Sequence, residues 1–324
     1  MTKDKKHPLI SVIVPNYQGK KVFPACIASL LKQDYPNKQI VFVDDCSTDG
    51  SIDLAKKRFN KKITIAKTTQ NSGFTGACNE GFLHCKGEYI IFVNNDMEFP
   101  KTWITDMYNG IKGKKNVIGA SLLLQGDDPR YLEKLINKGM YGCLTLVGSD
   151  ALRKITPLEK KNGLIEIFGA GICIAPRKAI GEQLFDPTYF AYCEDIEFCW
   201  RMRLQGFTVV VNKHAKMLHH GGYTRKTQKT FNKRAMFHGT KNRITNFLTF
   251  YETKNVIRLC IPFLISEVAA FLLSPQSWWS RLKSYLHIIT HVPSILQKRK
   301  QLQTTRKLPD EQIIRLLSYK FMDP

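Results

Sequence analysis

The sequence is poor in acidic residues. Its 324 residues include 27 Asp and Glu against 49 Lys and Arg, which gives a formal net charge of +22. A strong positive charge favours polyanionic partners, namely nucleic acid, anionic lipid or phosphorylated small molecules. Residues 198–251 contain no acidic residue but eleven Lys or Arg. Such a stretch is usually a solvated surface, although here it directly follows three carboxylates.

Paired cysteines and long uncharged runs are also missing. The nine cysteines form no C-x-x-C pair, so neither a disulfide framework nor a zinc knuckle is predicted, and we expect free thiols in a reducing cytosol. The N-terminal residues have no apolar signal core, which argues against export. Near the C-terminus, Arg258, Pro262 and Glu267 interrupt the apolar segments. We therefore expect no transmembrane helix and a cytoplasmic protein.

Strands and helices alternate through the first part of the chain. Apolar runs predict strands over residues 9–17, 39–45, 63–67, 89–93 and 117–124, and helical spacing predicts helices over 20–33, 49–60, 75–85 and 101–111. Ser47 or Asp49 is the expected cap of the second helix. Farther on, 165–175 and 207–211 are predicted strands and 193–205 a helix. This order predicts an α/β fold with a mainly parallel sheet.

Polar side chains follow three of these strands. They are Pro15-Asn16-Tyr17, Asp44-Asp45 and Asn94-Asn95-Asp96. Asp44 and Asp45 alone would be assigned to a turn or a helix cap. Three such ends should meet at one edge of the sheet, where open α/β folds bind ligands. Asp96 would there offer an oxygen ligand to a divalent cation.

The segment 71–81 joins a predicted strand to a predicted helix. It matches neither the dinucleotide G-x-G-x-x-G pattern nor a P-loop. Its glycines would still let the backbone approach a ligand, and the helix N-terminus would favour an anion.

Three carboxylates, Glu194, Asp195 and Glu197, open the helix predicted over 193–205. A favourable interaction with the helix dipole is the simplest explanation. Repulsion and partial burial would raise the pKa of one of them, which would suit a general base. Glu197 and Arg201 are four residues apart and are expected to pair for structural reasons.

Two histidines follow the strand predicted over 207–211. His219 and His220 would ordinarily be surface residues. Beside Asp96, one of them would be a second protein ligand for Mn²⁺ or Mg²⁺, with diphosphate oxygens completing the shell.

The C-terminal residues 251–324 are predicted to form a basic amphipathic helical tail. Trp278 and Trp279, followed by Arg281, Lys283 and the basic run 298–300, are typical of a segment that lies on an anionic membrane surface. The alternative is that these helices pack on the preceding domain.

Taken in order, these motifs resemble glycosyltransferase family 2, of the GT-A fold, over about residues 9–245. The similarity is closest to the rhamnosyltransferase-like members that build bacterial surface polysaccharides. The matching motifs are residues 11–17, 43–50, 71–81, 93–96 and 168–171, then Phe190-x-Tyr192-x-Glu194-Asp195-x-Glu197-x-x-x-Arg201 and His219-His220-Gly221-Gly222. Each motif is weak alone, and seven in this order are a strong signal.

The resemblance implies a GT-A-type nucleotide-sugar-binding domain over residues 1–250, with a mixed, mainly parallel central sheet, and a C-terminal helical extension. It assigns the donor site to two sets of residues: Pro15, Tyr17, Asp44 and Asp45 around the nucleoside, and Asn71, Gly73, Asn79, Asn94 and Asn95 around the nucleotide sugar. Asp96 and His219 would bind Mn²⁺ or Mg²⁺, with the register between His219 and His220 open. Asp195 matches the catalytic base, and Glu194, Trp200 and Arg201 would contact the acceptor or support the site.

The implied activity is inverting, metal-dependent, non-processive transfer of a sugar from a nucleoside diphosphate to a glycan hydroxyl, in bacterial cell-surface polysaccharide synthesis. The Q-x-x-R-W motif of processive members is absent. A lipid-linked acceptor on a polyprenyl phosphate is an alternative, as is peripheral attachment to the cytoplasmic face of the inner membrane. A non-enzymatic nucleic-acid-binding protein would fit the charge, but no recognition module is visible. A catalytically inactive homologue is disfavoured because both Asp96 and Asp195 are present.

Overall fold

The computed structural model describes residues 7–125, 140–148, 150–154, 160–161, 164–220 and 231–318. Gly221 and Gly222, which end the last motif, lie outside these ranges. So does most of the predicted loop region between residues 125 and 165.

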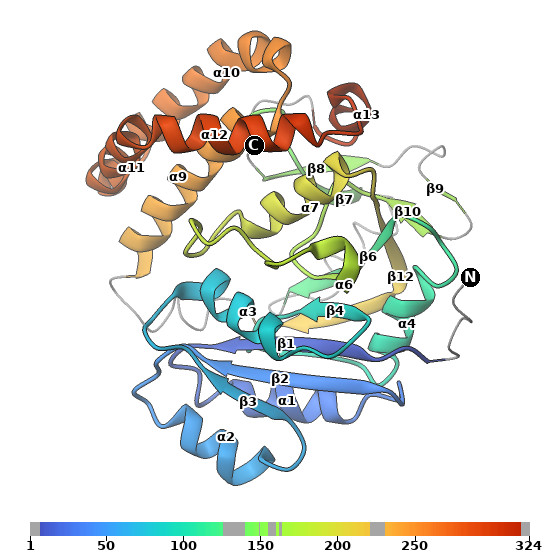
Figure 1. Ribbon diagram of the computed structural model, residues 1–324. Helices are drawn as coiled ribbons and strands as arrows, with labels where there is room; N and C mark the ends of the chain where they lie inside the picture. The colour runs from blue at the N-terminus through green and yellow to red at the C-terminus, as the bar shows by residue number, and fades with distance from the viewer. Residues whose placement is uncertain are drawn as a thin grey trace.

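The centre of the molecule is a ten-stranded mixed sheet (Figure 1). Its strands follow the order β3-β2-β1-β4-β11-β6-β12-β10-β9, and β5 pairs with β12. The strands are β1 (Ile10–Asn16), β2 (Lys38–Asp44), β3 (Thr64–Lys67), β4 (Tyr89–Phe92), β5 (Met97–Glu98), β6 (Val117–Gln125), β9 (Lys160–Lys161), β10 (Leu164–Glu166), β11 (Cys173–Pro176) and β12 (Thr208–His219). A separate hairpin joins β7 (Met140–Leu144) and β8 (Asp150–Lys154).

The first half of the sheet is parallel, as the alternating sequence predicted. β1 pairs in parallel with both β2 and β4, and β2 with β3. β11 then runs antiparallel between β4 and β6, while β12 is parallel to β6. The predicted α/β class with a mixed, mainly parallel sheet is therefore confirmed. The last strand is longer than predicted, because β12 continues past Val211 through a register shift to His219.

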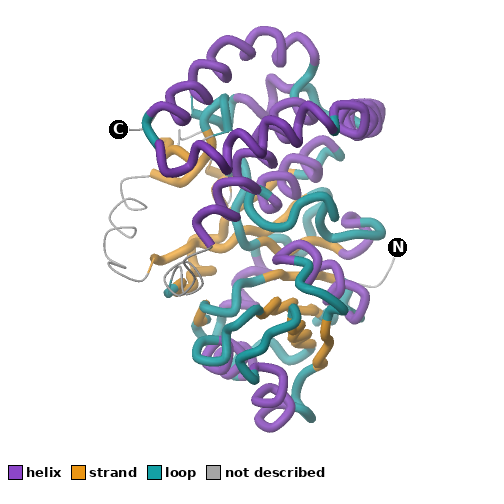
Figure 2. Tube along the Cα trace, turned by 90° about the vertical axis from the view of Figure 1, so that its left-hand side faces the viewer, coloured by secondary structure: helices purple, strands orange, loops and turns teal. Residues whose placement is uncertain are grey.

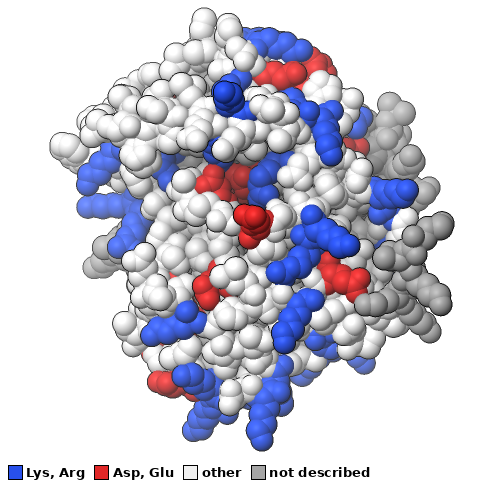
Figure 3. Space-filling model, viewed as in Figure 1, with Lys and Arg blue, Asp and Glu red and all other residues white. Residues whose placement is uncertain are grey.

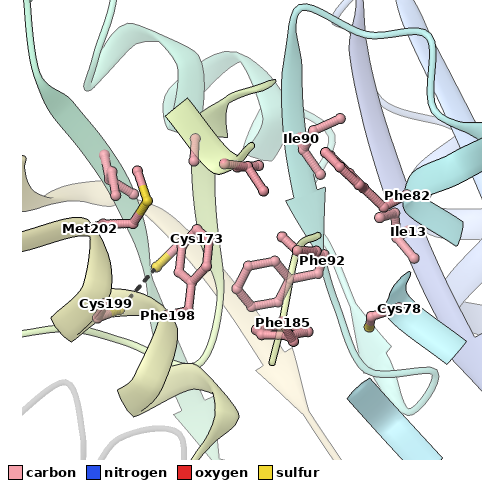
Figure 4. Packing of buried hydrophobic residues seen from close by; sticks show 14 of the residues in the cluster. Ile13, Cys78, Phe82, Ile90, Phe92, Cys173, Phe185, Phe198, Cys199 and Met202 are labelled. Atoms are coloured by element: carbon pink, nitrogen blue, oxygen red, sulfur yellow. Dashed lines mark hydrogen bonds between the residues drawn. The ribbon is translucent and has the colours of Figure 1, made fainter. Parts of the chain in front are cut away.

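Helices cover both faces of the sheet. One face packs against α1 (Phe23–Leu31) and α4 (Trp103–Asn109), and the other against α3 (Gly73–His84) and α7 (Glu194–Leu204). On the second face Phe92 of β4 lies between Phe185 and Phe198, with ring centroids 4.9 and 5.4 Å away (Figure 4). The backbone of α3 approaches closely, because a Cβ on Gly81 would lie 2.6 Å from Ile13 Cγ2.

The predicted cap of the second helix is wrong. α2 (Ser51–Phe59) begins after Gly50, which has φ of +81° and is the N-cap residue. Asp49 instead accepts hydrogen bonds from the Ser51 amide and hydroxyl at 3.0 and 2.6 Å, which closes the turn ahead of the helix. The left-handed conformation favours glycine at the capping position.

The C-terminal helices gather at one end of the molecule, beyond α7 (Figures 1 and 2). They are α9 (Phe231–Phe250), α10 (Thr253–Leu272), α11 (Trp278–Thr290), α12 (Val292–Thr304) and α13 (Asp310–Ile314), and the short η2 (Pro275–Ser277) joins α10 to α11. A short α6 (Arg177–Ile180) follows β11. The inner side chains of the C-terminal helices form a hydrophobic cluster with Trp200 of α7.

Among the described residues, α10 alone is long and apolar enough to cross a membrane by length and composition, with a mean hydropathy of 1.7. Arg258, Pro262 and Glu267, which were expected to interrupt the apolar segments, all lie within this one helix. The helix continues through Pro262, and Glu267 is buried with cationic partners. Only 22% of its most apolar window is buried inside the structure.

Candidate active site

The polar ends of β1, β2 and β4 meet, as expected from the parallel order of these strands. Asn16 is 1% exposed and connects all three: its amide nitrogen donates to Asp44 Oδ1 at 3.3 Å, and its oxygen accepts from Asn95 Nδ2 at 2.7 Å. Asn16 received no role of its own from the sequence. The sequence shows that Asn16 lies between the candidate residues Pro15 and Tyr17. Its contacts with Asp44 and Asn95, however, depend on how the strands pair and could not be predicted from the sequence.

Asp45 holds the loop that follows β3. Its Oδ1 accepts hydrogen bonds from Thr68 Oγ1 at 2.7 Å and from the amide and hydroxyl of Ser72, both at 2.9 Å. Its Oδ2 accepts from the Gly73 amide at 2.8 Å. Asp45 thus binds the amides at the start of α3, where a negative charge is favourable. Asp45 directly follows Asp44, the last residue of β2. Its hydrogen bonds therefore hold the loop after β3 at the edge of the sheet where the strands end.

The loop residues assigned to the nucleotide sugar differ in their surroundings. Gly73 has φ of +73°, and a Cβ there would lie 2.2 Å from the Phe190 carbonyl oxygen, so glycine is required. Asn71 Oδ1 is buried without a hydrogen-bond partner among the described residues. Asn79 exchanges two 2.9 Å hydrogen bonds with the Phe185 backbone and so anchors that loop. Pro15 is buried in β1 and Tyr17 is partly exposed just beyond its end.

Asp96 and His219 lie together, although 123 residues separate them in the chain. His219 Nε2 is 3.1 Å from Asp96 Oδ1, and Asn94 Nδ2 lies 3.4 Å from the same ring nitrogen. The antiparallel pairing of β5 with β12 creates this contact, since it sets Met97 opposite His219. His220 instead contacts Glu98 Oε1 at 2.7 Å.

The protein ligands available here suit a cation that takes most of its ligands from the substrate. No group of three or more His, Cys, Asp or Glu side chains that could hold a metal is found within the described ranges. Asp96 and His219 supply one carboxylate and one imidazole. Mg²⁺ and its analogues commonly use one or two protein ligands together with substrate phosphates and water. Asp96 is 8% exposed, so a cation bound here would be partly shielded from solvent.

The turn before α7 places Asp195. Tyr192 and Cys193 both have positive φ, 71° and 61°, immediately before Glu194. Asn242 of α9 holds this turn by donating to the carbonyls of Ala191 and Tyr192 at 3.0 and 2.7 Å. Asn246 of α9 donates to the Cys193 carbonyl at 3.3 Å. The sequence argument missed both asparagines, because nothing in their spacing links them to a turn some fifty residues earlier.

Left-handed backbone concentrates at this edge. Five non-glycine residues of the described chain have positive φ: Gln18, Cys46, Asn116, Tyr192 and Cys193. Gln18 and Cys46 follow β1 and β2, and two others precede α7. Such conformations cost of order 1–3 kcal/mol each and cluster at functional sites.

Of the three carboxylates at the start of α7, each has a different environment. Burial, with the neighbouring Asp195 charge, raises the pKa of Glu194 to about 8, and Glu194 Oε2 has no hydrogen-bond partner in the described part of the chain. Asp195 Oδ1 accepts from the Ile196 amide at 2.8 Å, and its Oδ2 faces Gly171, where a Cβ would lie 3.4 Å away. Glu197 is 1% exposed and pairs with Arg201 at 2.9 Å, as predicted.

Trp200 and Arg201 lie on the inner side of α7. Trp200 is 2% exposed and stacks on Phe250, 5.4 Å between ring centroids. Arg201 donates to the Leu184 carbonyl at 2.7 Å. Both residues therefore support the helix that carries Asp195.

A cavity of about 500 Å³ lies beyond α7, between this helix, the 183–188 loop and the C-terminal helices. Glu197, Arg201 and Lys241 are among its lining residues. Helical periodicity sets Glu197 and Arg201 on a different side of α7 from Asp195. The cavity is therefore separate from the edge where the strand ends meet.

The family model of glycosyl transferase family 2 matches residues 11–179, just over half of the chain. The chain belongs to glycosyl transferase family 2. This stretch includes the strand ends, Asp96 and the 71–81 loop.

Among curated relatives, the chain is 27% identical over 157 residues to a putative teichuronic acid biosynthesis glycosyltransferase, TuaG, of Bacillus subtilis, covering 43% of this chain and 62% of the relative. It is 32% identical over 107 residues to WfaP of Escherichia coli, a UDP-Glc:alpha-D-GlcNAc-diphosphoundecaprenol beta-1,3-glucosyltransferase, covering 33% of this chain and 43% of the relative. The match thus spans less than two thirds of either relative.

The solved structures show the same fold. A crystal structure of GalNAc-T7 with UDP, GalNAc and Mn²⁺ superposes with a TM-score of 0.62 at 16% identity, covering 81% of this chain and 51% of that one. The match confirms the GT-A fold expected from the motifs.

Proposed function

We propose that this chain is an inverting, metal-dependent, non-processive glycosyltransferase. In this proposal it moves a sugar from a nucleoside diphosphate donor to a hydroxyl group of a glycan acceptor, in bacterial cell-surface polysaccharide synthesis. The observation that carries it is the pair Asp96–His219 at the edge where the strands end, 3.1 Å apart, within a chain of family 2. TuaG is named as a putative glycosyltransferase of teichuronic acid biosynthesis, which supports this choice of pathway. The rhamnosyltransferase-like branch is part of this proposal.

Donor binding is assigned to the strand ends and the 71–81 loop. The unpaired Asn71 Oδ1 would accept a hydrogen bond from the donor, and Tyr17, Pro15 and Asp44 would surround the nucleoside. Asp45 and Asn79 act in this scheme by holding the loops that form the site. Asn94 and Asn95 would lie next to the diphosphate, since Asn94 is 3.4 Å from His219 and Asn95 directly precedes Asp96.

Asp195 is the proposed general base. An acceptor hydroxyl is a poor nucleophile at neutral pH, and a carboxylate within hydrogen-bond reach can take its proton as it attacks C1 of the sugar. Burial raises the pKa of Glu194 to about 8, which favours its protonated form at pH 7 and disfavours it as the acceptor of this proton. In the proposed displacement, the bond from acceptor oxygen to C1 forms as the bond from C1 to the diphosphate breaks. A single displacement of this kind inverts the anomeric configuration.

The leaving diphosphate develops negative charge, which a divalent cation stabilises when it is bound. Asp96 and His219 would hold that cation through one oxygen and one nitrogen. The basic residues that follow Phe198 supply further positive charge to this half of the molecule. The Mn²⁺ and UDP named with GalNAc-T7 support the same assignment of cofactor and donor class.

A lipid-linked acceptor is the second candidate. The name of WfaP specifies a sugar on diphosphoundecaprenol, and the described C-terminal helices expose large apolar side chains. Such an acceptor would place the enzyme next to an anionic membrane surface, at its cytoplasmic side, through the helical segment after residue 250. Partitioning of radiolabelled product into organic solvent separates this acceptor from a water-soluble glycan.

The test of the proposed function is a screen of nucleotide sugars for hydrolysis and binding, with Mn²⁺, Mg²⁺ or EDTA. We expect one donor to be bound and slowly hydrolysed only when a divalent cation is present. If no donor is bound or turned over, the enzyme assignment is wrong. If turnover persists in EDTA, Asp96 and His219 do not act through a metal.

A further inference from the structure

Helix α10 turns its apolar side away from the protein. Its exposed large side chains recur at helical spacing and form one stripe: Ile257, Ile261, Leu264, Ile265, Val268 and Leu272, between 55% and 71% exposed. A surface helix of a globular protein normally shows the opposite arrangement, with its apolar stripe on the core. Isolated exposed apolar residues are common, but a stripe along a whole helix marks an interaction surface.

Helix α11 continues this surface. Trp279 is 79% exposed, and Leu282, Leu286 and Ile289 are exposed at 46%, 61% and 69%. The corner between the helices is fixed, because Trp278 stacks on Phe271 at 5.3 Å and donates its indole N–H to the Phe271 carbonyl at 2.6 Å. We call the outward side chains of α10 and α11 the apolar face.

The inner sides of the same two helices carry polar groups. Glu267 of α10 is 6% exposed, pairs with Arg243 of α9, and lies 3.6 Å from Arg281 of α11. Tyr285 of α11 donates to Glu267 Oε2 at 3.0 Å. Arg281 was expected to face a membrane, and the structure instead places it in this buried network at 8% exposure. The inner side of α10 thus combines this network with the buried apolar residues Leu259 and Phe263. The exposed stripe is additional apolar surface that the protein core does not cover, which indicates an apolar partner of its own.

We propose that the apolar face docks on the surface of an anionic lipid leaflet, with α10 and α11 lying in the interface. The charges around it match this occupant. Residues 253–309 contain nine Lys or Arg and one acidic residue, Glu267, which is buried. Arg258 and Lys283 are exposed on the two helices, whereas the exposed Lys254 pairs with Glu311 at 2.7 Å. In the upper left of Figure 3, where α10 lies in Figure 1, the surface is largely uncharged. Basic side chains border it on the left edge, and basic and acidic side chains lie together at the top of the molecule.

A lipid surface explains these features better than other partners do. Two copies of the chain meeting through this face would bring like-charged basic rims together, which is unfavourable. A membrane-spanning α10 would have to leave α9, against which Phe263 stacks on Phe247 at 4.1 Å, and would expose Glu267 to hydrocarbon. Exposed Trp and basic side chains around an apolar stripe are the features of a helix that lies in the interface.

Docking on lipid does not depend on the transfer reaction. It extends the proposed function, because the apolar face would be the surface through which the enzyme reaches a membrane-bound acceptor. The test therefore measures binding to vesicles without donor or acceptor. Purified full-length chain is floated with vesicles of phosphatidylcholine alone or of phosphatidylcholine with phosphatidylglycerol. We expect flotation with the anionic vesicles, reduced by salt and reversed by alkaline carbonate.

Two variants separate the surface from a general apolar effect. The triple substitution Ile261→Ser, Ile265→Ser and Trp279→Ser should lower the partition coefficient on the order of 100-fold, because three apolar side chains lose their contact with lipid. Leu83→Ser is the matched control, since Leu83 is 70% exposed on α3, outside the apolar face, and it should float as the parent does. Both variants should keep the thermal transition and the nucleoside-diphosphate binding of the parent.

Other outcomes would overturn the proposal. Absence of flotation by the parent, or equal flotation of the triple variant, rules out this surface. Resistance to carbonate indicates a spanning helix. A concentration-dependent dimer that the triple substitution dissolves, without vesicle binding, assigns the face to a second copy. Because nucleoside-diphosphate binding is measured in the same samples, a failure of docking is distinguished from a failure of the proposed function.

Discussion

His219 Nε2 lies 3.1 Å from Asp96 Oδ1, although 123 residues separate the two in the chain. The contact exists because β12 extends beyond its predicted end and pairs with β5. The neighbouring residue, His220, is carried to the other side and contacts Glu98. The alternation of side chains along a strand thus separates two adjacent histidines into two environments.

His219→Ala should weaken Mn²⁺ binding, because it removes one of two proposed protein ligands. Loss of partners outside the first coordination shell already costs 10- to 100-fold in metal affinity, so an effect at least on that order is expected. The measurement is a Mn²⁺ titration in the presence of a nucleoside diphosphate.

His220→Ala is the matched control for this substitution. Its side chain is 48% exposed and pairs with an equally exposed Glu98, so Mn²⁺ affinity should stay within about twofold, since exposed pairs contribute little. If His220→Ala weakens Mn²⁺ binding more than His219→Ala does, the two histidines have exchanged roles relative to this proposal.

Asp195→Asn should abolish most of the transfer and leave donor binding intact. An amide cannot take the proton of the acceptor hydroxyl, and removing a general base costs about 10²- to 10⁴-fold in rate. The experiment compares kcat for transfer with the Kd for the donor. Near-parental turnover would remove Asp195 from the mechanism, and loss of donor binding would show that the substitution disturbs the site as a whole.

Glu194→Gln should retain transfer at pH 7 and change how stability depends on pH. In the native chain the pKa of Glu194 is about 8, whereas an unfolded glutamate titrates near pH 4.3. The native state therefore binds an extra proton between these values, and the free energy of unfolding falls as the pH rises through this window.

Glutamine resembles the protonated form of Glu194, so the free energy of unfolding of the variant should not fall with this titration. Thermal unfolding at pH 5 and pH 8.5 checks it: the variant should gain stability relative to the parent as the pH rises. A constant difference between the two proteins at both pH values would show that Glu194 is not held protonated.

The sequence was sufficient to predict the parallel half of the fold. Each apolar run of residues 9–93 is a strand, and the first three are followed directly by a helix, whereas the short β5 comes between β4 and α4. The sequence also identified the acids at the strand ends. It was not sufficient for contacts that depend on register and on distant helices. The Asn16 bridge required the pairing of β1 with β2, and the choice of His219 required the length of β12. Arg281 was assigned to the surface because composition shows that a helix is basic and apolar, but not which side turns inward.

Asn242→Ala tests whether α9 positions the turn that precedes Asp195, the proposed general base. The substitution removes the hydrogen bonds to the carbonyls of Ala191 and Tyr192, and two residues of this turn adopt positive φ that only surrounding contacts maintain. Buried hydrogen bonds lost in this way cost about 1–3 kcal/mol in the free energy of unfolding. A shift of the turn by about 1 Å would lower kcat on the order of 100-fold while donor affinity stays the same.

Asn212→Ala is the matched control, because Asn212 donates a 2.8 Å hydrogen bond to the Asp106 carbonyl on the far side of the sheet from α7. This control substitution should lower the free energy of unfolding by a similar amount without changing kcat. Equal effects of the two substitutions on kcat would reduce Asn242 to an ordinary structural residue.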